Sequence, residues 1–435
     1  MLLKNFFKYV IPSILSMWVF ALYTMVDGMF VAWGVGERAL ASVNLSMPYV
    51  IFIFSIGLLM ATGTSTLIAI ALGQKQEKEA SSLFTMNLVV MSLMSLAVTV
   101  LSLVFLEPLA LLLGASGDNL KYIKEYVGTI AVFAIFFILS YNMEALVKTD
   151  GTPMVSTIGV IACGLTNVAL DYLFVMKFHW GVFGAAFATG LAQVTSAVIF
   201  FIYFAKFRKK LRFCRFKWNP GIYKKIIPLG VSNGFTELSG GLVVFMFNKT
   251  ILHVIGEQGI VSYTVISYIN TLVLNTMAGI AQGMQPLTSY HYGSEQIGEC
   301  RKLLRYSMVM EAVVSAVYLL GLELFPQVFV GVFLGREDAL FSYTIKALQT
   351  YSLSFIFIGY NVVSAGYFTA VERPWHSFLI SAGRGLFFLS GTLPVMVWLL
   401  GEPGIWLSPF VSELICAAFA GFFLISQKKF LKMRK

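Results

Sequence analysis

The sequence has few charged residues for its length. Asp, Glu, Lys and Arg make up 12% of its 435 residues, about half of their share in soluble domains. Apolar residues make up 58%, and a water-soluble fold could not hide so many, because large exposed apolar patches are not tolerated. This balance excludes a soluble enzyme, a nucleic-acid-binding domain and a disordered chain, and it indicates a membrane protein.

The sequence also lacks the residue groups that common metal and nucleotide sites require. It has four cysteines, four histidines and no Gly-Lys dipeptide, so it shows neither a zinc-site spacing nor a phosphate-binding P-loop. Only one loop, a basic one in the middle of the chain, is long enough to gather catalytic groups. We therefore expect no catalytic residues, no cofactor and no nucleic-acid partner.

Long apolar segments are what the sequence has instead. Most of them exceed the roughly 18 residues that suggest a spanning helix, and backbone groups in lipid must be satisfied internally, which makes such segments helices. The sequence therefore predicts an all-α polytopic membrane protein with twelve transmembrane helices. They lie at residues 9–33, 43–72, 83–106, 124–147, 154–176, 182–205, 223–248, 258–282, 303–325, 340–368, 376–399 and 404–426.

The basic residues are distributed unevenly between the two sides of the membrane. If the N-terminus is cytoplasmic, 23 of the 31 Lys and Arg residues fall on the cytoplasmic side and 7 on the outer side. Cytoplasmic connections carry the excess of positive charge in membrane proteins. We therefore expect a multi-pass protein of the plasma membrane with both termini in the cytoplasm.

The chain reads as two similar halves. A basic segment at residues 206–222 separates six spans from six and divides a lobe at 1–205 from a lobe with a basic tail at 223–435. Similar residues recur at offsets of 220 or 221: Gly36-Glu37 and Gly256-Glu257, Gly63 and Gly283, Gly73 and Gly293, Glu79 and Glu299, Pro153 and Pro374, Gly184 and Gly404. The sequence therefore predicts two pseudo-symmetric lobes, an arrangement common in transporters that bind substrate between their halves.

Two carboxylates inside the first lobe are candidates for a functional role, because placing an ionisable group in a membrane span costs free energy. Asp27 lies 19 residues beyond Lys8, and Asp171 lies 18 residues beyond Pro153, which places both at a similar depth. Asn167 is one helical turn from Asp171, and Thr189 is on the next span. This set of oxygens suits a monovalent cation or a shared proton, although such groups could also simply hold helices together. The counterparts in the second lobe, residues 243–247 and 391–392, carry no acid.

The second lobe has charges of its own. Glu237, Glu311 and Arg384 lie eight or nine residues into their spans from the cytoplasmic side. We expect Arg384 to pair with Glu237 or Glu311, in a structural or a functional ion pair. Glu144 and Glu413 are further candidates for a cavity, although Glu144 could reach the inner interface instead.

Several motifs of the first lobe occur in a fixed order: Tyr23-Thr-Met-Val-Asp27-Gly-Met-Phe30-Val, Gly36-Glu-Arg-Ala-Leu40-Ala, Pro48, Gly151-Thr-Pro153, Asn167-Val-Ala-Leu-Asp171 and Gly184-Ala-Ala-Phe-Ala-Thr189. In their order, and with the two six-span halves, they resemble the multidrug and toxic compound extrusion (MATE) family over nearly the whole chain. The resemblance implies a secondary active antiporter that alternates between outward and inward V-shaped states. Such proteins expel organic, mostly cationic drugs in exchange for Na⁺ or H⁺.

The resemblance also implies roles for individual residues. Four of them match the first-lobe cation site of the family: Asp27, Asn167, Asp171 and Thr189. Tyr126 matches a tyrosine near that site, and Glu237 matches an acid implicated in some branches. The tenth span has no acid between Asn361 and Tyr367, which favours coupling through the first lobe.

Two other functions remain open at this point. A lipid-linked oligosaccharide flippase of the same superfamily is the nearer alternative, although such proteins often have two extra spans and a basic cavity. A membrane-embedded enzyme is remote, because site residues should converge in one place. For the antiporter we expect small organic molecules and the lipid bilayer as partners, and a monomer.

Overall fold

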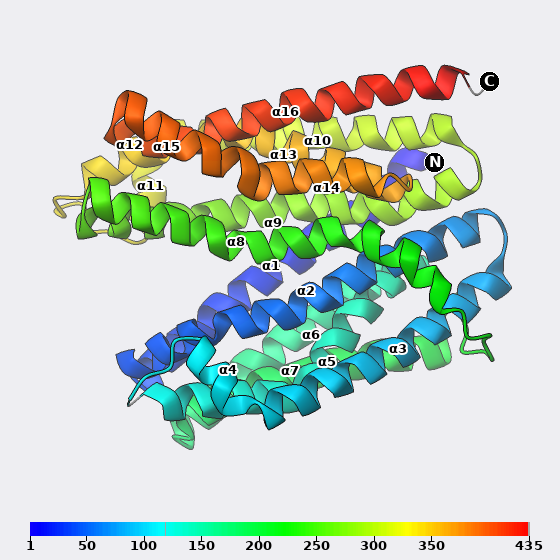
Figure 1. Cartoon of the computed structure of the whole chain (residues 1–435), viewed down its shortest axis with the longest axis horizontal. Helices are drawn as coiled ribbons and strands as arrows, with labels where there is room; N and C mark the ends of the chain where they lie inside the picture. Colours follow the sequence, from blue (N-terminus) through cyan, green and yellow to red (C-terminus); the bar gives the residue numbers. More distant parts are fainter. Residues whose placement is uncertain (118, 434–435) are drawn as a thin grey trace. The chain divides into compact units, whose positions relative to one another are not determined.

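The computed structural model describes residues 1–117 and 119–433, and the regular secondary structure in these ranges is entirely helical. Blue to green ribbons in Figure 1 are α1 (Leu2–Gly34), α2 (Glu37–Gly73), α3 (Glu77–Val104), α4 (Leu106–Leu112), α5 (Asn119–Thr149), α6 (Pro153–Asp171) and α7 (Gly181–Ile202). Green to red ribbons are α8 (Tyr223–Val254), α9 (Glu257–Gly293), α10 (Ile297–Leu324), α11 (Pro326–Val330), α12 (Phe341–Ser352), α13 (Phe355–Ala370), α14 (Pro374–Ala382), α15 (Phe388–Leu400) and α16 (Glu402–Met433). Short π-helical turns, η1 (Tyr172–Lys177), η2 (Tyr203–Phe207) and η4 (Gly383–Phe387), extend or interrupt three of them, and a 3₁₀ turn, η3 (Pro220–Ile222), precedes α8.

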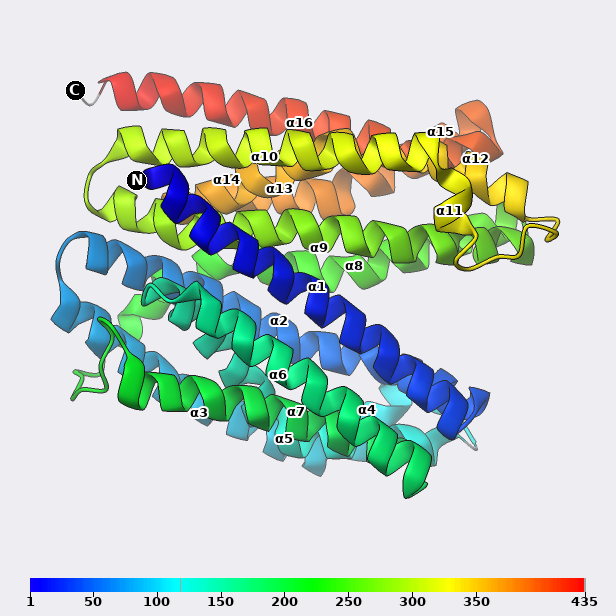
Figure 2. The same ribbon diagram turned by 180° about the vertical axis from the view of Figure 1, so that it is seen from behind.

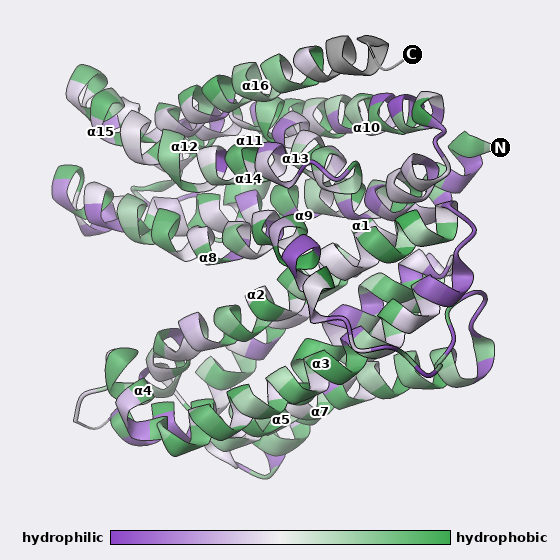
Figure 3. Ribbon diagram, turned by 45° about the vertical axis from the view of Figure 1, so that its right-hand side comes forward, coloured by the Kyte–Doolittle hydropathy of each residue, from purple (hydrophilic) through white to green (hydrophobic). Residues whose placement is uncertain are grey.

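The prediction of an all-α polytopic membrane protein is confirmed, and a long helical segment occupies each of the twelve predicted spans. Ten helices of the described chain are long and apolar enough to cross a membrane. The pair α12 and α13 would make an eleventh span that is bent by 42° at its break. The remaining segment, α8, has 32 residues but is more polar, since it carries Glu237, Lys249 and two adjacent glycines. In Figure 3 the helices are largely hydrophobic, and hydrophilic residues concentrate towards helix ends and in connections.

Helix bounds follow the repeat. Both α2 and α9 have 37 residues, and both α3 and α10 have 28. In each of these pairs the second helix begins 220 residues after the first. Proline is the first residue of both α6 and α14, where its missing N–H costs nothing. The two halves therefore place helix starts and stops at equivalent positions because equivalent residues begin and end them.

The described chain forms two compact units. One comprises Phe7–Gly230 and Ser289–Gln296, and the other comprises Met1–Phe6, Val231–Thr288 and Ile297–Lys435. In the first unit, α5 packs against α2, α3 and α7, and α6 packs against α7 (Figures 1 and 2). In the second unit, α13 packs against α10, α14 and α16. The division into lobes at residues 206–222 stays a prediction.

Two glycines that mark the repeat contact each other's helix within the first unit. A Cβ atom on Gly73 would collide with the backbone carbonyl of Tyr290, and a Cβ atom on Gly293 would collide with that of Ile70. Gly73 and Gly293 are 220 residues apart, and so are Ile70 and Tyr290. The contact is therefore symmetric in the repeat, and it requires glycine on both sides because backbone atoms cannot move aside as a flexible side chain can.

The basic segment between the halves is held in place by one carboxylate. Asp150, which is 1% exposed, accepts hydrogen bonds from the backbone N–H groups of Lys209, Lys210 and Leu211, each at 2.7 Å. The Tyr203 hydroxyl donates a fourth hydrogen bond at 2.6 Å. Hydrogen bonds to a charged acceptor are stronger than neutral ones, so Asp150 fixes the start of this segment against the end of α5.

Candidate functional site

Four residues predicted to hold a cation or proton come together within the first unit. Asp27 lies near the end of α1, Asn167 and Asp171 lie in the last turns of α6, and Thr189 lies in α7. The Asn167 amide donates to the Thr189 hydroxyl at 3.3 Å, and that hydroxyl lies 3.5 Å from an Asp27 carboxylate oxygen. The Thr189 hydroxyl also lies 3.0 Å from the Ala185 carbonyl, one turn earlier in its own helix. Three helices thus contribute side chains to one polar cluster.

The two carboxyl groups of this cluster are neighbours within hydrogen-bonding reach of each other. Asp171 and Asn167 are fully buried, whereas Asp27 and Thr189 are partly exposed. Neither Asp171 oxygen, nor the Asn167 amide oxygen, has a hydrogen-bond partner among the described residues. Unpaired buried oxygens are costly, and a proton shared between the carboxyls or a monovalent cation would satisfy them. Tyr126 of α5, 2% exposed, lies close to both carboxyls.

Asp171 lies where α6 changes its winding. The π-helical turn η1 begins at the next residue, and such turns often mark functional sites. Gly34 of α1 is close enough to Val175 in this turn that a Cβ atom there would clash with it. The sequence did not indicate the π-turn, because its residues are as apolar as those of a regular helix.

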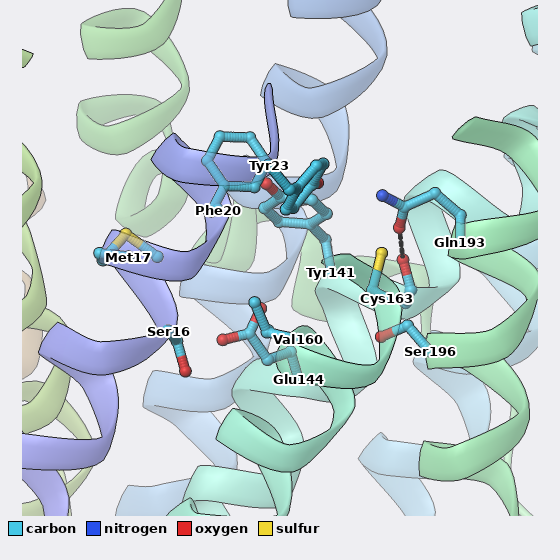
Figure 4. Close-up of a pocket in the computed structure, with 11 residues that line it drawn as sticks. Ser16, Met17, Phe20, Tyr23, Tyr141, Glu144, Val160, Cys163, Gln193 and Ser196 are labelled. Carbon is cyan, nitrogen blue, oxygen red and sulfur yellow. Dashed lines mark hydrogen bonds between the residues drawn. The ribbon is translucent and has the colours of Figure 1, made fainter. Parts of the chain in front are cut away.

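A pocket opens elsewhere in the first unit, between α1, α5, α6 and α7 (Figure 4). Its aromatic side comprises Phe20, Tyr23 and Tyr141, and its polar side includes Glu144 and Gln193. The other residues that line it are Ser16, Met17, Ser140, Val160, Cys163 and Ser196. Aromatic surface and polar groups thus face each other around a cavity of about 20 Å³, which is the size of a water molecule rather than of an organic compound.

The negative charge of Glu144 at the pocket is neutralised by a neighbouring lysine. Lys148 forms a buried ion pair with Glu144 at 2.8 Å, one turn away on α5, and the Ser140 hydroxyl donates to the Gln193 amide oxygen at 2.7 Å. Glu144 thus lies beside a pocket, and its part in a substrate cavity stays a prediction. Ser140 and Gln193 escaped the sequence analysis, because single neutral polar residues in apolar segments are common.

In the second unit, Arg384 does not pair as expected. It donates from Nε to Glu413 Oε1 at 2.9 Å, and the Asn361 amide donates to the other Glu413 carboxylate oxygen at 2.7 Å. The prediction of Glu237 or Glu311 as its ion-pair partner is therefore wrong. Equal depth along a helix does not fix which face a residue occupies, nor which helices are neighbours.

The other two acids of the second unit lie apart from this pair. Glu311 is 2% exposed on α10, and neither of its oxygens has a hydrogen-bond partner among the described residues. Glu237 is exposed on α8. Within the described chain, no group of three or more His, Cys, Asp or Glu residues is arranged to hold a metal ion.

Comparison with known proteins identifies the family. The family model described as MatE matches residues 12–173 and 229–387, one stretch in each half. The chain belongs to the MatE family. Members of this family are transporters and not enzymes, and the two matched stretches correspond to the two halves of the sequence repeat.

Curated relatives and solved structures agree with the MatE assignment. The chain is 22% identical to the multidrug export protein MepA of Staphylococcus aureus over 416 residues, covering 95% of this chain and 91% of MepA. It is 23% identical to MepA of Staphylococcus haemolyticus, with 99% and 95% covered. An outward-facing multidrug resistance MATE transporter has the same fold, with a TM-score of 0.93 at 21% identity over 99% and 96% of the two chains. A MOP superfamily transporter from Pyrococcus furiosus gives 0.91 at 22% identity, with 99% and 96% covered.

Proposed function

We propose that this MatE protein is a secondary active antiporter that exports organic, mainly cationic compounds in exchange for Na⁺ or H⁺. The observation that carries the proposal is the cluster of Asp27, Asn167, Asp171 and Thr189, in which buried oxygens lack partners beside two adjacent carboxyls. The names of the curated relatives as multidrug export proteins support the choice of cargo.

The proposed cycle uses alternating access. Binding of the cation or proton at Asp27 and Asp171 favours one state, and binding of the drug favours the other. Coupling requires each ligand to bind the two states with different affinity. Tyr126 and the aromatic side chains around the Figure 4 pocket would contribute to drug binding in a state in which this cavity is wider, since aromatic faces attract organic cations. Glu144 would provide a polar contact for the drug, and Glu237 would contact the drug in the substrate cavity.

Acidic groups without basic partners favour a cationic cargo over the lipid-linked oligosaccharide of the alternative proposal. The first-lobe cluster has two carboxyls, and Lys148, which lies beside Glu144 of the pocket, is already paired with that glutamate. A phosphate-linked cargo would instead need unpaired Arg or Lys donors. We place both termini in the cytoplasm, as the distribution of basic residues predicts.

The test is efflux of a fluorescent organic cation from everted membrane vesicles, with the Na⁺ and pH gradients imposed separately. We expect one gradient to drive transport, and it identifies the coupling ion. Asp27→Asn should abolish the driven component while the protein remains in the membrane. No response to either gradient would remove the antiporter proposal, and normal pumping by Asp27→Asn would remove this coupling site.

A further inference from the structure

Glu311 is the most isolated buried charge-bearing group of the second unit. Its side chain lies on the buried face of α10, and neither oxygen meets a donor among the described residues. An ionised carboxylate in this position would bear the full cost of desolvation without a hydrogen bond to offset it. A carboxyl in a membrane span that has no donor is therefore either protonated or occupied by a ligand.

The surroundings of Glu311 are polar but carry little charge. Ser307 and Ser315 lie one turn before and one turn after it on the same buried face, and neither hydroxyl has a partner among the described residues. Gly359 of α13 makes room for the carboxyl, because a Cβ atom there would collide with Glu311 Oε2. The Glu311 carboxyl is thus packed against Gly359, with serine hydroxyl groups one helical turn away on either side.

Arg384 is the charged group that acts on Glu311. The Nε atom of Arg384 is already bonded to Glu413, whose second oxygen accepts from Asn361. Of the elements packed against α10, α12 carries Tyr343, Lys346 and Tyr351, α13 carries Tyr360 and Tyr367, and α11 carries no titratable or charged side chain. The elements behind them add His376 on α14, Arg384 on η4, and Glu402, Glu413 and Cys416 on α16 up to residue 426; α15 carries none.

The charge count decides between the ionised and the neutral form. With Arg384 and Glu413 both charged, their pair is neutral, so an ionised Glu311 would leave this interior with one net negative charge. A protonated Glu311 leaves it neutral and can donate its O–H to a serine hydroxyl. A free cation is disfavoured as the occupant, because Arg384 already supplies positive charge close to the carboxyl.

We propose that Glu311 is a proton-binding site of the second lobe, and that its proton controls which carboxylate Arg384 pairs with. When Glu311 is protonated, Arg384 pairs with Glu413, as in this structure. When Glu311 releases its proton to water, its carboxylate competes with Glu413 for the guanidinium. The protonation itself does not depend on the proposed drug exchange, and only its contribution to transport rests on that function.

Infrared spectroscopy of the purified full-length protein tests the proposal, because a protonated carboxyl has a C=O stretching band that is lost on ionisation. The background is Asp27→Asn/Asp171→Asn, which removes the first-lobe carboxyls from the signal. At neutral pH we expect a buried-carboxyl band that is lost in Glu311→Gln and kept in Glu323→Gln, a control that removes an exposed acid on the same helix. A band unchanged by Glu311→Gln would overturn the proposal.

A second variant tests the exchange of partners. Glu413→Gln removes the charge that holds Arg384, so we expect the Glu311 band to weaken several-fold at the same pH as Arg384 turns to the ionised Glu311. An unchanged band in Glu413→Gln would disprove the exchange. Loss of the band on addition of Na⁺ at fixed pH would show a cation site instead and overturn the proton assignment. None of these readouts uses efflux, so failure here is separable from failure of the proposed antiport.

Discussion

The two halves of the repeat carry different chemistry at equivalent positions. In the first lobe, Ser140, Cys163 and Gln193 line a pocket. Residues 220 or 221 positions later are Asn361, Arg384 and Glu413, which form a buried hydrogen-bonded ion pair. The guanidinium thus stands in the second lobe where the first has a small thiol beside an open space.

This difference shows how a symmetric backbone can be specialised. Helix bounds follow the offset of the repeat, so the scaffold of each lobe depends on apolar faces, glycines and prolines that both halves share. The polar residues inside each lobe are free to differ, because a few side chains at fixed positions decide whether the interior is open or filled. At these equivalent positions the first half keeps a polar space open, and the second half fills it with a hydrogen-bonded ion pair.

Neutralising the first-lobe site should have the largest effect on activity. Asp171→Asn keeps the size of the side chain but removes a carboxyl that the proposed cation or proton requires. We expect gradient-driven efflux to fall to the level of vesicles without the protein, while the unfolding temperature in detergent does not fall, because a neutral amide is cheaper to bury than a carboxylate. Glu323→Gln is the control and should pump normally. Driven efflux near the wild-type rate in Asp171→Asn would contradict the functional reading of the first lobe.

Removing the guanidinium of the second lobe should instead cost stability. Arg384→Met leaves Glu413 buried without its charged partner, and breaking a buried pair in this way costs about 3–5 kcal/mol. Denaturant unfolding in detergent measures it, and Arg384→Met/Glu413→Met should recover most of the loss, since no buried charge of the pair then remains. At the equivalent first-lobe position, Cys163→Ala should cost about 1 kcal/mol, the usual size for a single substitution. Equal losses of unfolding free energy in Arg384→Met and Cys163→Ala would contradict the proposed difference between the two halves.

The sequence could predict that the two first-lobe carboxyls lie at a similar depth, and the reason is geometric. Asp27 and Asp171 lie at matching distances from the predicted span starts at Lys8 and Pro153, and helices of known rise convert that count into depth. Their proximity in the structure agrees with the count. The membrane fold was predictable for a similar reason, since long apolar runs in lipid leave the helix as their solution.

The sequence did not predict how each helix is rotated about its axis, nor where a helix is broken. The sequence predicts that Arg384 pairs with an acid on a span that also enters the membrane from the cytoplasmic side. Its observed partner, Glu413, lies on a span that the sequence predicts to enter from the outer side. The break between α12 and α13 and the π-turns η1 and η4 lie within or at the end of segments that the sequence predicts as continuous spanning helices. Which face of a helix meets which neighbour depends on packing across the lobe, which local sequence does not encode.

Alanine at the paired glycines tests whether the repeat extends to packing. Gly73→Ala and Gly293→Ala each place a methyl group against a backbone carbonyl of the partner helix, and overpacking of this kind costs about 1–3 kcal/mol. Because the contact is symmetric, we expect the two losses in denaturant unfolding to be equal within error. Gly240→Ala, at a position with no neighbouring atom within 4 Å of the added carbon, is the control. A large loss at one glycine alone would show that the two halves pack differently here.

The smallest effect is expected from an ion pair at the surface, in contrast to the buried pair of the second lobe. Lys124 contacts Glu107 of α4 at 2.8 Å, but both side chains are exposed. The hydrogen bond and charge of Lys124 lower the pKa of Glu107 below its ordinary value, so the pair stabilises the fold above the unfolded pKa of a glutamate and loses that effect as the pH falls through the folded one. Exposed pairs are screened by solvent and salt, so Glu107→Gln should melt with the wild type at neutral pH in moderate salt. A melting difference that persists in high salt would show that this pair is less exposed to solvent than its geometry indicates.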